Sequence, residues 1–306
     1  MNAVEVIDLK KTYSTKKESI TALHGISFNV NEGELFGLIG PDGAGKTSLF
    51  RILTTVLLPD GGSATVNGFD AVKDYKQIRN CVGYMPGRFS LYQDLTVEEN
   101  LSFFATLFNT TIEENYDLVK DIYVQIEPFK KRKAGKLSGG MKQKLALSCA
   151  LIHKPKVLFL DEPTTGVDPV SRKEFWEMLK RLKAQGITIL VSTPYMDEAM
   201  LCDRIALIQH GTILSIETPQ KIIDSFARQL YAIKAKNIYQ LLKDVNTFEG
   251  TLNSYAFGEY LHLIFKTYDK QNEARLLEYL DSKKHVEVEL NAIQPTIEDC
   301  FIALMN

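Results

Sequence analysis

A lysine, a threonine and several glycines between Gly40 and Thr47 are spaced as in a phosphate-binding loop. The segment reads Gly-Pro-Asp-Gly-Ala-Gly-Lys-Thr and matches the pattern G-x-x-x-x-G-K-[ST] between an expected strand and an expected helix. Glycines let backbone N–H groups converge on phosphate oxygens, and the positive end of the following helix points at them. We expect Lys46 to reach the outer phosphates and the Thr47 hydroxyl to bind Mg²⁺. The candidate residues are Gly40, Pro41, Asp42, Gly43, Ala44, Gly45, Lys46, Thr47 and Ser48.

Two adjacent acids, Asp161 and Glu162, follow the apolar run Val157–Leu160. An acid at the carboxyl end of a buried parallel strand faces the crevice where ligands bind in α/β sheets. Asp161 is therefore a candidate ligand of hydrated magnesium, and Glu162 is a candidate for polarising an attacking water. Two acids that end a strand are often only a solvated turn, so it is the phosphate loop upstream that favours the catalytic interpretation.

A third motif, Leu-Ser-Gly-Gly, begins at Leu137 and precedes the apolar helical stretch Leu145–Ile152. Ser138 is a favourable N-cap, and Gly139 and Gly140 leave backbone amides accessible at a second anion-binding helix start. A capped helix without a ligand is the alternative interpretation.

The order and spacing of these motifs resemble those of ABC-type ATPases, whose signature is LSGG shortly before an apolar strand that ends in Asp-Glu. The resemblance covers about residues 3–222. It implies that ATP with Mg²⁺ is the ligand and that water accepts the phosphoryl group. Tyr13 matches the family's aromatic residue that stacks on adenine, and Asp168 matches the acid near the dimer interface. In this family each nucleotide lies between the phosphate loop of one subunit and the LSGG of the other.

The resemblance implies an α/β fold, namely a P-loop NTPase with a RecA-like parallel core, an N-terminal antiparallel β subdomain and a helical signature subdomain. The apolar pattern agrees: residues 4–36 alternate as antiparallel strands do, and short apolar runs are typical of buried parallel strands. These runs are Leu35–Ile39, Val157–Leu160 and Ile187–Val191, with helices expected at Lys46–Leu58 and within Leu91–Pro155. We expect a cassette domain over residues 1–225, with its helical part at about 88–155, and a small C-terminal α+β domain over 226–306.

The pattern after residue 223 predicts strands and helices in the order of a ferredoxin-like split βαβ unit. The expected elements are strands at Tyr231–Lys236, Thr251–Phe257, Tyr260–Tyr268 and Val286–Leu290, and helices at Ile238–Val245, Asn272–Lys283 and from Thr296. The segment Pro295–Phe301 resembles the short extension of drug-export-type cassette ATPases. We expect this domain to serve assembly or regulation.

Composition narrows the function further. The 306 residues are 45% hydrophobic and 24% charged, as in globular proteins, and the net charge of −2 gives no reason to expect nucleic-acid binding. No apolar run reaches the roughly 18 residues that span a bilayer, and no signal peptide is visible. We therefore expect a peripheral protein on the cytoplasmic face of the membrane. The cysteines form no CxxC pair and are expected to be reduced thiols: Cys81, Cys149, Cys202 and Cys300.

The chain departs from the family at two positions. Gly87 occupies the place of the Q-loop glutamine, and Pro194 that of the switch histidine. Glycine has no side-chain ligand, and proline has no donor even on its backbone. Loss of one preorganised donor typically lowers the rate about 10²- to 10³-fold, so binding should persist while hydrolysis at this chain's own site is slowed. Asp42, where many relatives have asparagine, adds negative charge near the phosphates. The histidines are expected in the core or on the surface: His24, His153, His210, His262 and His285.

The favoured function is the ATP-binding and ATP-hydrolysing subunit of an ABC exporter, docked on integral membrane permeases supplied as separate chains. An intact Ser138 motif beside a damaged switch region favours a heterodimer with a second, complete ATPase subunit over a homodimer. The alternatives are a non-hydrolysing, nucleotide-gated regulatory subunit and a cassette ATPase of translation or DNA repair. Some aromatic residues are expected at the docking surface and more of them in the core: Phe89, Tyr92, Phe103, Phe104 and Phe108.

Overall fold

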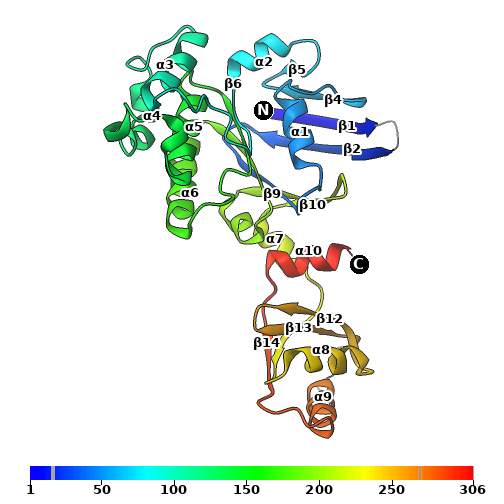
Figure 1. The fold of residues 1–306 in the computed structure, drawn as a ribbon. Helices are drawn as coiled ribbons and strands as arrows, with labels where there is room; N and C mark the ends of the chain where they lie inside the picture. Colours follow the sequence, from blue (N-terminus) through cyan, green and yellow to red (C-terminus); the bar gives the residue numbers. More distant parts are fainter. Residues whose placement is uncertain (15–17, 268, 270, 306) are drawn as a thin grey trace. The chain divides into compact units, whose positions relative to one another are not determined.

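A computed structural model describes residues 1–14, 18–267, 269 and 271–305 (Figure 1). The chain divides into two compact units, an N-terminal unit, Met1–Gln220, and a C-terminal unit, Lys221–Asn306. The short helix α7 (Pro219–Asp224) contains the boundary.

The N-terminal unit begins with an antiparallel sheet of strand order β2-β1-β4-β5. Along β1 the residues Ala3, Val4, Val6 and Leu9 are buried, whereas Glu5, Ile7 and Asp8 are exposed. Val4 lies opposite Val30 on one side and Val66 on the other, so apolar side chains share one face of the sheet. The strands are β1 (Asn2–Ser14), β2 (Ser19–Asn31), β4 (Gly61–Val66) and β5 (Phe69–Asp70).

The second sheet of this unit has the order β10-β9-β3-β8-β7-β6, and all its pairs are parallel except β9–β10. Every residue of β3, β7 and β8 is buried, as expected for central strands covered on both faces. Because parallel strands end at the same edge, the residues after β3, β7 and β8 come together there. The strands are β3 (Leu35–Ile39), β6 (Val82–Met85), β7 (Val157–Asp161), β8 (Thr188–Thr193), β9 (Arg204–Gln209) and β10 (Thr212–Glu217).

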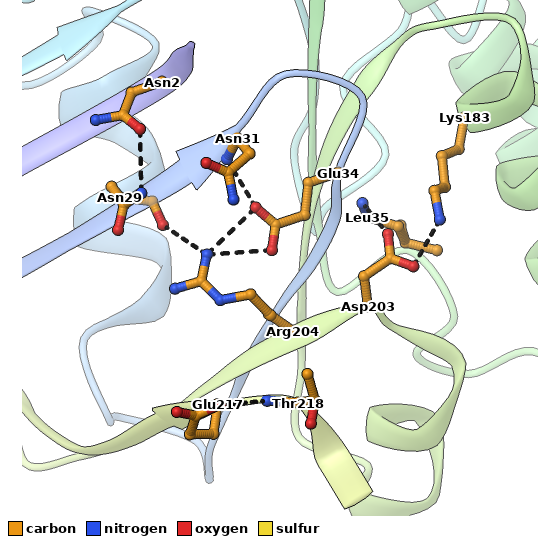
Figure 2. A network of polar contacts seen from close by, with 10 residues as sticks. All are labelled: Asn2, Asn29, Asn31, Glu34, Leu35, Lys183, Asp203, Arg204, Glu217 and Thr218. Atoms are coloured by element: carbon orange, nitrogen blue, oxygen red, sulfur yellow. Dashed lines mark hydrogen bonds and ion pairs between the residues drawn. The ribbon is translucent and has the colours of Figure 1, made fainter. Parts of the chain in front are cut away.

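A polar network joins the two sheets (Figure 2). Arg204 at the start of β9 donates to the backbone oxygen of Asn29 on β2 and contacts the Glu34 carboxylate at 3.2 Å. Glu34 is 7% exposed and also accepts the N–H of Asn31, so its buried charge is fully partnered. Asp203 accepts the N–H of Leu35 at 2.8 Å. These contacts hold the beginning of β3, the strand that leads to the phosphate loop.

Helices α1, α5 and α6 pack against strands of the parallel sheet, and α5 also packs against α3 and α4 in the helical region (Figure 1). Thr96 and Glu99 form the reciprocal capping box at the start of α3. The first helix is shorter than expected: α1 ends at Leu53 because Thr55 adopts a left-handed φ of 62°. The helices are α1 (Lys46–Leu53), α2 (Tyr75–Cys81), α3 (Val97–Leu107), α4 (Tyr116–Tyr123), α5 (Gly139–Leu151) and α6 (Pro169–Ala184), with 3₁₀ turns at Glu127–Phe129, Ala134–Lys136 and Met196–Leu201 (η3).

The C-terminal unit contains an antiparallel sheet of order β12-β13-β11-β14 with helices between the strands. This is the split βαβ arrangement predicted from the sequence. The last strand begins at Glu289 rather than Val286, because Lys284 and Glu287 have left-handed φ values of 64° and 59°. Tyr268, expected to end a strand, lies outside the described residues. The elements are β11 (Leu230–Lys234), α8 (Ile238–Thr247), β12 (Thr251–Phe257), β13 (Tyr260–Phe265), α9 (Gln271–Ser282), β14 (Glu289–Ile293) and α10 (Ile297–Met305).

Candidate functional site

The loop between β3 and α1 can be built only with glycine at key positions. A Cβ atom on Gly40 would lie 2.1 Å from the Ile208 oxygen, and one on Gly45 would lie 2.4 Å from the Ala22 oxygen. Gly45 also has a left-handed φ of 105° and precedes α1 without a side-chain cap. The N–H groups of the first turn of α1 are therefore left for an anion, which the positive helix end favours.

Lys46 is 3% exposed, and its ammonium group lies at the centre of the loop. It donates to the backbone oxygens of Gly40 at 2.7 Å and Pro41 at 3.0 Å. It also forms an ion pair with Glu162 at 3.1 Å. The ends of β3 and β7 thus bring the lysine of one motif to the second acid of the other. Asp42 is exposed on the same loop, and Thr47 is partly buried in the first turn of α1.

The two acids at the end of β7 are held by β8. The buried Asp161 accepts a hydrogen bond from the Ser192 hydroxyl at 2.6 Å. Glu162 has a φ of 51°, which is uncommon for a residue other than glycine, and its N–H donates to the Ser192 backbone oxygen at 3.0 Å. Sequence reasoning missed Ser192; the available signal was a polar residue at the end of the apolar run Ile187–Val191.

Tyr13 lies beside the phosphate loop although it comes from β1. Its hydroxyl is 3.1 Å from the Ser48 hydroxyl on α1, and the residue is 39% exposed. The ring is thus an accessible aromatic surface next to the loop, of the kind that can stack on a base.

The signature segment is placed apart from this loop. Ser138 caps α5 by accepting the Met141 N–H at 3.4 Å. A Cβ atom on Gly140 would lie 3.3 Å from the Ser171 hydroxyl, so the start of α5 lies close to the first turn of α6. Across the described residues, no hydrogen bond or ion pair joins the segment at 137–143 to the loop at 40–48.

Asp168 is the N-cap residue of α6, directly before the first turn of that helix. Its carboxylate accepts the N–H groups of Val170 at 3.1 Å and Ser171 at 3.0 Å. The hydrogen bonds from Ser171 are the main cause that lowers the pKa of Asp168 below its usual value. The acid is therefore ionised and oriented at neutral pH.

Both departures from the family lie at the edge of the site. A Cβ atom on Gly87 would approach the Asp161 backbone oxygen to 3.0 Å, so this backbone runs along the end of β7. Pro194 directly follows β8, whose last residue, Thr193, accepts the N–H of Gly40 through its backbone oxygen at 3.2 Å.

The histidines lie within the two units or on their surfaces, as expected. His153 stacks on Phe108 with centroids 3.8 Å apart, and burial lowers its pKa. His262 and His285 pair with acids of the C-terminal unit, and His24 and His210 are exposed. The cysteines are free thiols, and no cluster of potential metal-binding residues occurs in the described part of the chain.

The five aromatic residues singled out in the helical region correct one expectation, because none of the five is fully buried. Tyr92 and Phe103 are 52% and 41% exposed, and their rings contact one another with centroids 5.0 Å apart. Phe89, Phe104 and Phe108 are only partly buried. No helix among the described residues is both long and apolar enough to cross a membrane.

A phosphate loop between β3 and α1, acids after the buried β7 and a separately capped signature helix together define an ATP-binding cassette of the P-loop NTPase class. A family model described as "ABC transporter" matches residues 23–165. The chain belongs to the ATP-binding proteins of the ABC transporter family.

The relatives and solved structures agree with this assignment. The chain is 39% identical over 292 residues to the "Probable multidrug ABC transporter ATP-binding protein YbhF" of Escherichia coli (strain K12), covering 93% of this chain but only 49% of that relative. It is 37% identical to "Nod factor export ATP-binding protein I" of Rhizobium sp. (strain N33), covering 72% of this chain and 73% of that protein. The ADP- and Pi-bound dimer of the ATP-binding cassette MJ0796 has a TM-score of 0.64 and 26% identity, over 70% of this chain and 98% of the cassette. The P-loop NTPase fold predicted from the sequence is therefore confirmed.

Proposed function

We propose that this chain binds MgATP at the loop 40–48 and hydrolyses it to power export through membrane permease subunits. The observation that carries the proposal is the convergence of Lys46, Glu162 and Asp161 where β3, β7 and β8 end, next to a helix start without a side-chain cap. Charge of both signs, backbone donors and a carboxylate near the phosphates are the parts that phosphoryl transfer to water needs.

The residues fit a magnesium ion. Asp161 offers a buried carboxylate whose Oδ2 atom accepts no hydrogen bond from the described residues, and Mg²⁺ prefers such oxygen ligands. Thr47 would supply the second protein oxygen. The ion would neutralise phosphate charge when bound. Lys46 holds the outer phosphates, and Glu162 orients and polarises the attacking water from its strained backbone position.

Export is supported by the printed names of the relatives, which describe multidrug and Nod factor export. The partners would be integral membrane permeases, and the chain would lie on the cytoplasmic face of the membrane. The chain spans about half the length of YbhF, so the name of that relative supports a role in transport for this chain only as a proposal.

We further propose a heterodimer with a second ATPase subunit. Gly87 and Pro194 remove two groups from this chain's own site, while Ser138 and its glycines remain available to a partner. In the assembled complex, Ser138→Arg should lower ATP turnover at least about 100-fold because it blocks the complete site. Glu162→Gln should reduce turnover only modestly. The reverse ranking, or rapid turnover by the purified chain alone, would contradict the pairing.

A non-hydrolysing regulatory subunit is the second candidate, and the same two substitutions favour it. The ion pair of Glu162 with Lys46 speaks against it, since it keeps the candidate general base at the phosphate loop. A single measurement separates the candidates: the assembled complex would keep its full turnover in Glu162→Gln if this chain does not hydrolyse ATP, and would show the modest reduction if it does.

Nucleotide binding itself is tested by Lys46→Ala in the full chain. We expect MgATP affinity, measured by calorimetry, to fall at least about tenfold, equivalent to 1.4 kcal/mol, because the buried ammonium is lost. Lys180→Ala is the matched control, since Lys180 is 46% exposed and pairs with Glu177 on the same helix. Unchanged affinity in Lys46→Ala would refute the assignment of this site.

A further inference from the structure

Two segments begin at the phosphate site, one after β7 and one after β8, and they contact each other again through Arg172. After β7, residues 162–167 lead into α6, whose first turns carry Arg172. After β8, Pro194 and Tyr195 lead into η3, which carries Glu198. Because β7 and β8 are paired strands, both segments begin at the phosphate site.

Arg172 contacts the second segment at three points, one of which is the exposed Asp197 carboxylate at 3.9 Å from its Nη1 atom. Its guanidinium carbon lies 4.1 Å from the centroid of the Tyr195 ring, a cation–π geometry. Its Nε atom lies 3.6 Å from Oε1 of Glu198. Helix α6 is thus joined to the segment that follows β8, which begins with Pro194 at the position of the switch histidine.

Glu198 is itself tied to the phosphate loop. It is 2% exposed, and its Oε2 atom accepts the Thr193 hydroxyl at 2.5 Å. The same Thr193 hydroxyl accepts the Tyr195 N–H at 3.1 Å, while the Thr193 backbone oxygen accepts the N–H of Gly40. Thr193 is therefore hydrogen-bonded to both Gly40 and Glu198, so a displacement of Gly40 can be transmitted to Glu198 through Thr193.

The contact between Arg172 and Glu198 is incomplete. Nε of Arg172 and Oε1 of Glu198 are both buried, and neither has a hydrogen-bond partner in the described part of the chain. Their separation of 3.6 Å exceeds the roughly 2.7–2.9 Å of a charge-assisted hydrogen bond. Two buried, opposite and unsatisfied groups that face each other favour any small movement that closes the gap.

We propose that Arg172 is a positioning residue that couples nucleotide at the phosphate loop to helix α6 by closing onto Glu198. This inference rests on the proposed nucleotide binding. Pro194 supplies no side-chain donor at the switch position, whereas Arg172 on α6 contacts both Tyr195 and Glu198 of the switch segment. The movement would reach Asp168, which caps α6, and Ser171, which lies against Gly140 of the signature segment. Nucleotide bound at this chain's phosphate loop would thereby shift the signature segment, which contributes to the nucleotide site of the partner subunit.

The chain carries its own reporter for this movement. Trp176 is the single tryptophan, lies on α6 one turn after Arg172 and is 2% exposed. Its indole N–H is buried and makes no hydrogen bond to the described residues. Tryptophan emission of the full chain should therefore change when MgATP is added.

The experiment compares Arg172→Ala with Arg181→Ala. Arg181 is the matched control, because it lies on the same helix, is 55% exposed and approaches Asp121 only to 3.8 Å. We expect Arg172→Ala to bind MgATP within about twofold of the natural chain, as measured by calorimetry. Its fluorescence response should fall at least about fivefold, the scale of a modest coupling. Arg181→Ala should keep both the affinity and the response.

Two milder variants guard against a folding defect in Arg172→Ala. Glu198→Gln keeps the side-chain volume but removes the charge, and should lose the response. Arg172→Lys keeps the charge without the planar stack on Tyr195, and should restore part of the response. A full response in Arg172→Ala or Glu198→Gln, or an equal loss in Arg181→Ala, would overturn the proposal. MgATP binding by the natural chain without any change in emission would overturn this coupling alone, whereas absence of binding would overturn the proposed function with it.

Discussion

Asp161 in the N-terminal unit and Asp299 in the C-terminal unit are 2% and 0% exposed, yet their carboxylates are partnered differently. Oδ1 of Asp299 accepts hydrogen bonds from Tyr255 at 2.7 Å and His262 at 2.5 Å. Its Oδ2 accepts both the N–H and the hydroxyl of Thr296 at 2.7 Å. Burial alone would raise the pKa of Asp299, but these hydrogen bonds outweigh it and lower the pKa below its usual value.

Asp161 has far fewer partners. Ser192 donates to its Oδ1 at 2.6 Å, and its Oδ2 accepts no hydrogen bond from the described residues. The neighbouring Glu162 reaches Lys46 from a left-handed backbone position. A buried acid whose bonds are all satisfied stabilises the fold, whereas one with an unused oxygen beside a glycine loop is available to a ligand.

The strongest test of this contrast removes the satisfied acid. Asp299→Ala should lower the free energy of unfolding of the C-terminal unit by about 3–5 kcal/mol, because His262 and the other buried donors lose their acceptor. Hydrogen exchange of peptides from β13 and α10, measured by mass spectrometry on the full chain, reports this loss. MgATP affinity should not change. The adjacent, exposed Glu298→Ala is the control, and weaker nucleotide binding in Asp299→Ala would break the comparison.

The opposite pattern is expected at Asp161. Asp161→Asn keeps an acceptor for Ser192, so unit stability should change by less than about 1 kcal/mol. The affinity for ATP in the presence of Mg²⁺ should fall about tenfold, since the carboxylate that attracts the ion is lost. Calorimetric titrations with Mg²⁺ and with EDTA separate the two contributions. Asp94→Asn, at an exposed position, is the control, and an equal loss of affinity in EDTA would argue against a metal role.

The smallest effect is expected when the C-terminal unit is removed. Its own apolar core includes Ile233, Leu261 and Leu263, and no phosphate-site residue comes from it. A chain truncated after Ser225 should therefore fold and bind MgATP within about twofold of the full chain. Circular dichroism and calorimetry measure the two properties. A truncated chain that aggregates or loses affinity would show that the domain boundary proposed near residue 225 is wrong and that the two units are not independent.

Local features of the site were predictable because short segments encode them. The glycine pattern at 40–45 predicted the loop, the apolar runs predicted β3 and β7, and Ser138 predicted the start of α5. The pattern after residue 230 predicted the order of strands and helices along the C-terminal unit. Two element boundaries differ from expectation, the end of α1 and the start of β14. Thr55 and Glu287 adopt left-handed backbone conformations there, which their residue types do not predict.

By itself, the sequence determined the phosphate loop, the acids that follow a buried strand and the capped signature helix, since each depends on residues within one segment. The tertiary structure alone decided which side chains meet. Ser192 reaches Asp161 across 31 positions, and Asp299 reaches His262 across 37. Arg172 faces Glu198 only because β7 and β8 lie side by side. Periodicity and spacing carry no information on such pairs, because strand order and helix packing bring them together only once the core has formed.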